Sequence, residues 1–266
     1  MTLLARFLTV LALLAICLAS PAMADFKKGM SAYEAGDYAT ALKEWRPLAE
    51  KGNTDAQYGL GLIYDSGKGV PQDNAEAAQW YRKAAELGLA SAQSNLGVLY
   101  ANGQGVKQNY VEAARWYRRA AEQEYAMAQF NLGVLYEKGQ GLKQNHAEAV
   151  RWYRRAAEQG DADAQLNLGL LYAKGQGVPQ SYAKAIRWYR MAAEQGDADA
   201  QRGLGLLYAK GQGVPQDLVQ AHLWLYLAAA QGDKGAAKER DLLVKKMTPV
   251  QLTQAQKLAR GWKPKK

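Results

Sequence analysis

Residues 164–172 read AQLNLGLLY and residues 185–194 read AIRWYRMAAE, and these two segments decide the fold. In each of them, small and large apolar residues recur at intervals of three and four, which places them on one face of an α-helix. Residues 174–180 read KGQGVPQ, and such glycines and prolines are typical of a turn. The stretch therefore predicts two helices joined by a short loop.

The same pattern recurs every 36 residues. A helix pair that cannot bury its apolar face alone does so by stacking on copies of itself. We predict five units, which cover residues 53–88, 89–124, 125–160, 161–196 and 197–232. Each unit has one tryptophan on its second helix, and we expect these side chains to pack in the core: Trp80, Trp116, Trp152, Trp188 and Trp224.

The ends of the predicted helices are marked by capping residues. Each second helix follows a residue that is a good N-cap, in the set Asp73, Asn109, Asn145, Ser181 and Asp217. In four of the five units, Glu or Gln three positions later predicts a capping-box pair. Gly52, Gly88, Gly160, Gly196 and Gly232 follow second helices, where a left-handed residue is favoured. Glu124 breaks this rule, which predicts a less regular joint after the second unit.

The units resemble the Sel1-like repeats, relatives of the tetratricopeptide repeats. The resemblance rests on the Ala, Leu-Gly and Tyr of the first helix, the GxGV loop, and the Ala, Trp-Tyr and Ala-Ala of the second, over residues 53–232. It implies an all-α fold, a right-handed superhelical α-solenoid of stacked helix-turn-helix repeats. It also implies adaptor and regulatory roles, including envelope signalling and host contact.

The ends of the array differ from its middle, as the caps of a solenoid do. Residues 25–52 resemble a tetratricopeptide hairpin whose loop is four residues shorter. Residues 233–262 predict capping helices, the last of which begins with Thr248 as N-cap and Pro249 at its first position. Residues 263–266 form a basic tail that we expect to be disordered.

Residues 1–24 have the features of a secretory signal peptide: an arginine, an apolar run and an Ala-x-Ala pattern that predicts cleavage after Ala24. We therefore expect a periplasmic or secreted protein with no membrane span after cleavage. Cys17, the only cysteine, lies in this segment, so the mature chain forms no disulfide. Arg6 is the only basic residue lost, and the remaining excess of Lys and Arg favours acidic partners or anionic envelope surfaces over nucleic acid.

No motif predicts catalysis, a metal or a cofactor. The repeated GxG lacks the third glycine or GK[ST] of a phosphate loop. Ser181 and Lys184 form the SxxK of penicillin-recognising enzymes, and some cysteine-rich members of the resembled family are linked to β-lactams, which makes a β-lactam-binding hydrolase a remote alternative. Ser181, however, occupies an N-cap position. His146 and His222 are the only histidines, and we expect His146 to be exposed.

The resemblance implies a concave face made of the first helices, and we predict a protein or peptide partner there. The partner's identity does not follow from the sequence. The position two residues before the repeat leucine varies most between units, which suits a surface adapted to a partner; Tyr58 and Phe130 are the expected anchors. The predicted binding residues are Tyr58, Ser94, Phe130, Leu166, Arg202, Asp65, Glu137, Asn102, Lys138, Lys174 and Lys210.

A basic ladder on the second helices supports an alternative, the binding of peptidoglycan or an acidic envelope polysaccharide. Its residues are Arg82, Arg118, Arg154, Arg190, Arg115, Arg151 and Arg187. The first four each precede a glutamate by four positions, which predicts ordinary ion pairs along one helix with Glu86, Glu122, Glu158 and Glu194.

Overall fold

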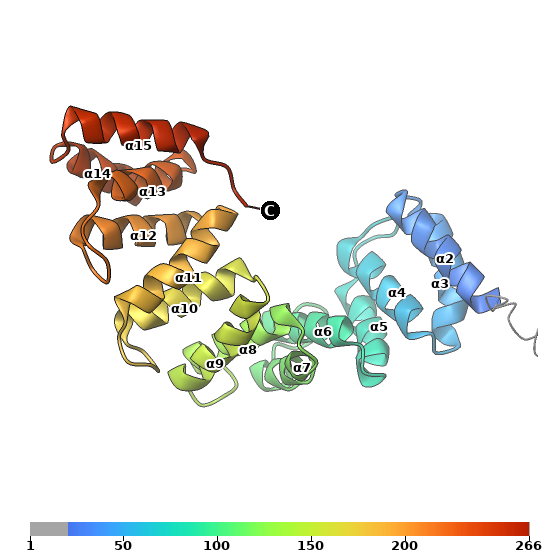
Figure 1. Cartoon of the computed structure of the whole chain (residues 1–266). Coiled ribbons are helices and arrows are strands. Elements are labelled where there is room, and N and C mark those ends of the chain that lie inside the picture. The colour runs from blue at the N-terminus through green and yellow to red at the C-terminus, as the bar shows by residue number, and fades with distance from the viewer. Residues whose placement is uncertain (1–20, 266) are drawn as a thin grey trace, which may run out of the picture. The chain divides into compact units, whose positions relative to one another are not determined.

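The computed structural model describes residues 21–265, so most of the predicted signal peptide, residues 1–20, lies outside the described residues. This part of the chain is all-helical, with 14 helices and no strand (Figure 1). None of these helices is long and apolar enough to cross a lipid bilayer. The chain divides into two compact units, residues 1–108 and residues 109–266.

The first unit contains helices that pack in chain order, each on the next. The side chains of Trp45, Leu60, Ile63 and Tyr81 are almost completely buried in it. The turn between its first two described helices covers only three residues, which agrees with the predicted short loop. Its described helices are α2 (Pro21–Glu34), α3 (Tyr38–Glu50), α4 (Thr54–Ser66), α5 (Asn74–Glu86) and α6 (Ala90–Asn102).

The second unit continues the alternation of first and second helices. The tryptophans of its second helices are 6–8 % exposed, so their predicted place in the core is confirmed. Its helices are α7 (Tyr110–Glu122), α8 (Ala126–Lys138), α9 (His146–Glu158), α10 (Ala162–Lys174), α11 (Tyr182–Gln195), α12 (Ala198–Lys210), α13 (Leu218–Ala230), α14 (Lys234–Val244) and α15 (Pro249–Gly261).

All five predicted N-caps of the second helices are confirmed, since each side chain accepts hydrogen bonds from the backbone of the first turn. The predicted capping-box pairs are wrong, because the glutamates bond elsewhere. Glu76 accepts from Trp80 Nε1 at 2.8 Å, and Glu112 pairs with Arg115 at 2.7 Å. Thr248 does form a full capping box with Gln251, one turn into α15.

The loop between the helices of each repeat is held in the same way throughout. In KGQGVPQ, Gln180 donates to the carbonyl oxygen of Ala173 at 2.7 Å, and Gly175 caps α10 at φ 69°. Gly177, at φ 72°, lies against the start of α9: a Cβ there would come 2.3 Å from the carbonyl carbon of His146. Glycine is therefore required at position 177, both by the positive φ and by the close approach of the preceding repeat.

The basic tail was expected to be disordered, and for residues 263–265 this expectation is wrong. Lys265 donates from its backbone nitrogen to the carbonyl oxygen of Glu194 at 2.7 Å and forms an ion pair with that carboxylate at 2.7 Å. Just before it, the Trp262 ring meets the Trp224 ring edge to face at 6.4 Å between centroids. The tail is thus packed along α11 and α13; Lys266 lies outside the described residues.

Candidate functional site

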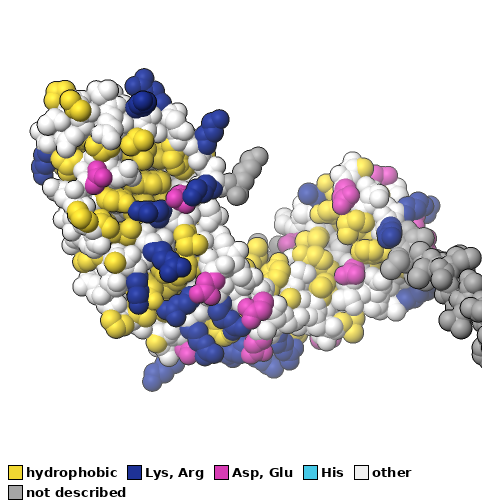
Figure 2. All heavy atoms as spheres, in the orientation of Figure 1, with side chains coloured by type: hydrophobic (Ala, Val, Ile, Leu, Met, Phe, Trp, Pro, Cys, Tyr) yellow, Lys and Arg dark blue, Asp and Glu magenta, His cyan; other side chains and the backbone are white. Residues whose placement is uncertain are grey.

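A groove of about 640 Å³ lies between α10 and α12 in the second unit. Its apolar lining comes from Leu166, Leu170 and Leu206, which the helical spacing places on the exposed side of the first helices. Arg202 and Lys210 supply positive charge at the same groove. On the face of this unit that Figure 2 shows, hydrophobic side chains form a band with Lys and Arg beside it. The groove thus offers both apolar area and positive charge.

Two of the groove's polar side chains differ in their availability. Arg202 forms ion pairs with Asp199 at 3.3 Å and Asp233 at 3.2 Å, so much of its charge is balanced within the protein. Lys210 is exposed and has no ion pair within residues 21–265. Lys210 is therefore the stronger candidate for contact with a partner.

Tyr189 of α11 lines the base of this groove and is only 4 % exposed. Its counterparts one and three repeats earlier, Tyr153 and Tyr81, donate to Glu137 at 2.6 Å and to Asp65 at 3.1 Å. Ala173 stands at the position of that acid before Tyr189, and both residues line the groove; no hydrogen bond of the Tyr189 hydroxyl is found within residues 21–265. Burial raises the pKa of Tyr189 to about 12, so its hydroxyl stays protonated at neutral pH.

Four of the predicted binding residues already contact other side chains of the protein. The rings of Tyr58 and Phe130 are half-buried and lie against Tyr81 and Tyr153, at 5.8 Å and 5.7 Å between centroids. Asp65 and Glu137 accept the tyrosine hydroxyl bonds described above.

Ser94 is a correction to the predicted set. It is fully buried, at 0 % exposure, so it cannot contact a partner at the surface. Its side chain is too short to reach past its neighbours, unlike the larger residues at the same repeat position. Asn102, Lys138 and Lys174 are exposed at the ends of their helices, as a binding role requires.

The arginines of the basic ladder have structural partners. Arg82 donates to the hydroxyl of Tyr100 at 2.7 Å, Arg118 to Tyr136 at 2.9 Å and Arg154 to Tyr172 at 2.6 Å, each on the first helix of the next repeat; Arg190 donates likewise to Tyr208. The predicted ion pairs with the glutamates four residues later do not form among the described residues.

The other three ladder arginines also lie on the second helices and are exposed, as Arg154 and Arg190 are. Arg115 pairs with Glu112 at 2.7 Å, Arg151 lies 4.0 Å from Glu148, and the guanidinium of Arg187 lies 5.5 Å from the Trp188 ring.

The polar residues considered for catalysis or metal binding have other surroundings. The Ser181 hydroxyl accepts from the backbone of Lys184 at 3.3 Å, as an N-cap does. His146 is half-buried rather than exposed, and His222 is buried at 3 % exposure beside Tyr226. Within residues 21–265 no three His, Cys, Asp or Glu side chains are grouped as metal ligands would be.

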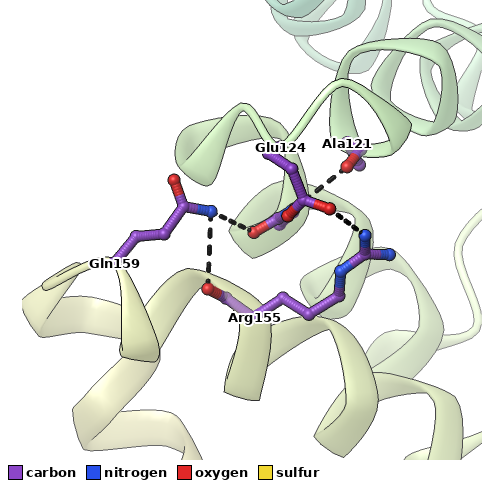
Figure 3. A network of polar contacts seen from close by, with 5 residues as sticks. Ala121, Glu124, Arg155 and Gln159 are labelled. Carbon is purple, nitrogen blue, oxygen red and sulfur yellow. Dashed lines mark hydrogen bonds and ion pairs between the residues drawn. The ribbon is translucent and has the colours of Figure 1, made fainter.

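Glu124 is the only non-glycine residue at positive φ in the described chain, at φ 61°, and such residues are often found at functional sites. Here its carboxylate accepts from Arg155 and, at 2.8 Å, from Gln129, which also bonds the carbonyl oxygen of Ala121 (Figure 3). The hydrogen bonds at this joint differ from those at the next two, where Gln195 and Gln231 donate to the carbonyl oxygens of Gly160 and Gly196. α7 and α8 nevertheless keep the usual 13 residues. The positive φ of Glu124 thus has a structural role, because it accompanies the side-chain bonds to Gln129 and Arg155.

Tyr189 and Asn167 also line the groove, although neither is among the predicted binding residues. A signal was present in the sequence. The residue 16 positions before the tyrosine is acidic at Asp65 and Glu137 but alanine at Ala173, and Gly203 replaces the repeat's asparagine. Tyr189 thus lacks both of the polar partners that Tyr81 and Tyr153 have, whereas Tyr117 lacks only the acid, because Ala101 stands there and Asn131 keeps the asparagine.

A protein-family model described as Sel1 repeat matches residues 54–89, 90–125, 126–161, 162–197 and 198–233. A crystal structure of a Sel1 repeat protein from Oxalobacter formigenes is similar, with 42 % identity, TM-score 0.75, and 80 % of this chain and 88 % of that chain covered. A protective antigen of uropathogenic Escherichia coli strains, described as displaying an SLR fold, has 35 % identity and TM-score 0.82, with 96 % of this chain and 56 % of that chain covered.

Among curated proteins, an exopolysaccharide production negative regulator of Rhizobium leguminosarum bv. viciae is 42 % identical over 52 residues. The match covers 20 % of this chain and 20 % of that protein, so it spans about a fifth of the curated relative.

Proposed function

Because this chain belongs to the Sel1 repeat family, whose members are generally protein-interaction scaffolds, we propose that it is an exported, non-catalytic scaffold that binds a protein or peptide. The observation that carries the proposal is the groove between α10 and α12, with leucines along its lining and Lys210 beside them. Half-exposed apolar side chains with polar groups at their edge are typical of a peptide-binding surface.

Binding of an envelope polymer by the basic ladder is less well supported. Arg118 and Arg154 each donate to a tyrosine of the next repeat, which gives these arginines a structural role and holds one guanidinium nitrogen of each away from a polymer, although Arg154 is exposed. The short match to an exopolysaccharide regulator supports a regulatory partner for the scaffold more than direct contact with a polymer. A β-lactam hydrolase would require Ser181 to leave its N-cap bond.

Site-specific crosslinking tests the proposal. A photoreactive amino acid replaces Leu206 in the groove, or Val111, which is 53 % exposed on the second helix α7 and serves as the matched control. If the chain is a scaffold that binds at this groove, irradiation in cells of the source organism should give a protein adduct from position 206 that is missing from position 111. Identical adducts from both positions, or none from position 206, would contradict it.

A further inference from the structure

We propose that the groove of the second unit binds an acidic peptide, which places one carboxylate on the Tyr189 hydroxyl and apolar side chains on the neighbouring leucines. The inference rests on the proposed function, since it names the chemistry of the partner that the groove accepts. Three features carry it: an unpartnered tyrosine, a row of lysines and a row of apolar side chains.

The protein's own repeats indicate what the Tyr189 hydroxyl binds. At the corresponding position Tyr153 donates to a carboxylate of Glu137 at 2.6 Å, and Tyr81 donates to a carboxylate of Asp65 at 3.1 Å. Ala173 leaves this place without an acid, and the pocket lies open there. A carboxylate from a partner would supply the acceptor that the first and third repeats supply from within, and a buried donor gains most from a charged acceptor.

Four lysines lie in a row at 36-residue spacing near the ends of the first helices. They are exposed and form no ion pair in the described residues: Lys138, Lys174, Lys210 and Lys246. A lysine near a helix C-terminus also stabilises the helix through a favourable interaction of its charge with the helix dipole. That effect does not require these residues, because α4 and α6 end at the same left-handed glycine cap with Ser66 and Asn102 in this position. The positive row is thus a property of the second unit.

An apolar row accompanies the lysines: Val134, Leu170, Leu206 and Leu242. Leu242 is 46 % exposed, and a smaller cavity of about 210 Å³ extends the groove from Leu206 and Lys210 to α14. A polyanion without apolar groups would leave this row uncovered. A second copy of this chain, with net charge +9, would repel the lysines. An acidic peptide that also carries leucine or phenylalanine is complementary to both rows.

The test uses an array of synthetic peptides built from Asp, Glu, Leu and Phe, from which the tightest binder is labelled for fluorescence anisotropy with the purified chain. Tyr189→Phe removes only the hydroxyl, and a hydrogen bond to a charged group predicts affinity lower by about 10-fold or more. Tyr153→Phe is the matched control, because its hydroxyl is already taken by Glu137, and it should leave affinity unchanged.

Two further variants sharpen the result. Ala173→Glu recreates the internal acid of the earlier repeat, so it should occupy the Tyr189 hydroxyl and abolish binding while the fold is kept, as circular dichroism would report. Lys174→Gln with Lys210→Gln should weaken binding and reduce its salt dependence. Lys143→Gln with Lys257→Gln, which changes two exposed lysines outside the row, should do neither.

The outcomes separate this inference from the function on which it rests. No binder in the array, equal binding of the peptide's Gln and Asn version, or equal loss from Tyr153→Phe would overturn the acidic-peptide site. Equally tight binding of polygalacturonate, which lacks apolar side chains, would overturn it in favour of polymer binding. If the array fails but position 206 still gives its specific protein adduct, only the chemistry assigned to the partner is wrong.

Discussion

The side-chain nitrogen of Gln159 lies 2.8 Å from the side-chain oxygen of Gln129, and this bond recurs in the next two repeats. There Gln195 donates to Gln165 and Gln231 donates to Gln201, both at 2.9 Å. Each accepting glutamine is buried and uses its own nitrogen to bond a carbonyl oxygen eight residues earlier. Both ends of a buried amide are thereby satisfied, which avoids a large desolvation cost.

The first repeat lacks this bond, and a single substitution should restore it. Leu87 stands where the later repeats have the donor glutamine and is 59 % exposed, while the side-chain oxygen of Gln57 is buried without a partner. Leu87→Gln should raise the free energy of unfolding by about 0.5–1.5 kcal/mol, the usual net contribution of a hydrogen bond. Urea unfolding measures it, with Leu87→Ala as control; an equal gain from both variants would refute the explanation.

The second glycine of the loop should be far less tolerant than the glycine that ends a second helix. Gly177 and Gly160 are both at positive φ, 72° and 98°, but a Cβ meets the His146 backbone at the first and nothing within 4 Å at the second. Gly160→Ala should cost about 1–2 kcal/mol in unfolding free energy. Gly177→Ala should cost about 2–5 kcal/mol, because overpacking adds to the strain. Similar urea midpoints for the two variants would contradict this.

Glu124 should be replaceable by glycine but not by alanine. Glu124→Gly removes the strain of positive φ and matches the glycine found at the end of five other second helices. Glu124→Ala keeps the strain and loses the bonds to Arg155 and Gln129. We expect the urea midpoint to stay level or rise for the glycine variant and to fall for the alanine variant. A lower midpoint for glycine than for alanine would show that the carboxylate matters more than the backbone.

His222 should make the protein less stable in mild acid. Burial lowers the pKa of its imidazole, and Arg240 nearby acts in the same direction against a weaker opposing effect of Asp241. The unfolded chain takes up this proton near its ordinary pKa of about 6.5, whereas the folded chain does so only at lower pH. The stability that neutral His222 contributes is therefore fully present above the unfolded-state pKa. It is lost as pH falls from that pKa toward the lower pKa of the folded chain.

His222→Phe keeps the ring beside Tyr226 and cannot be protonated. Urea midpoints between about pH 7.5 and 5, a range that spans the ordinary histidine pKa, should fall less for this variant than for the wild type. The comparison cancels Asp161 and Asp197, whose pKa values burial raises in both proteins. Parallel curves for the two proteins would rule out His222 as the source of the acid sensitivity.

Features that repeat within one unit could be predicted from the sequence, because their partners are close in the chain. The N-caps such as Asp73, the glycine turns and the buried tryptophans are of this kind. Contacts between repeats could not be predicted in the same way. Arg154 bonds Tyr172 on the next repeat rather than Glu158 on its own helix, and Lys265 bonds Glu194, 71 residues earlier.

The candidate site was predicted in part for the same reason. Leu166, Arg202 and Lys210 follow from helical spacing on the first helices, and the structure places all three at one groove. Tyr189 belongs to a second helix, and its role depends on the acid that is missing at Ala173. Ser94 failed as a binding residue because variation at a repeat position does not reveal how far a short side chain lies from solvent.

At three of the loop glycines, Gly105, Gly141 and Gly177, an added Cβ would meet only main-chain atoms of the preceding repeat. The helix starts at these three joints carry unrelated side chains: Asn74, Tyr110 and His146. The joint between neighbours is thus indifferent to side-chain identity at that point. An array built on such joints can gain whole units by duplication, and each new copy can drift in sequence without loosening the stack.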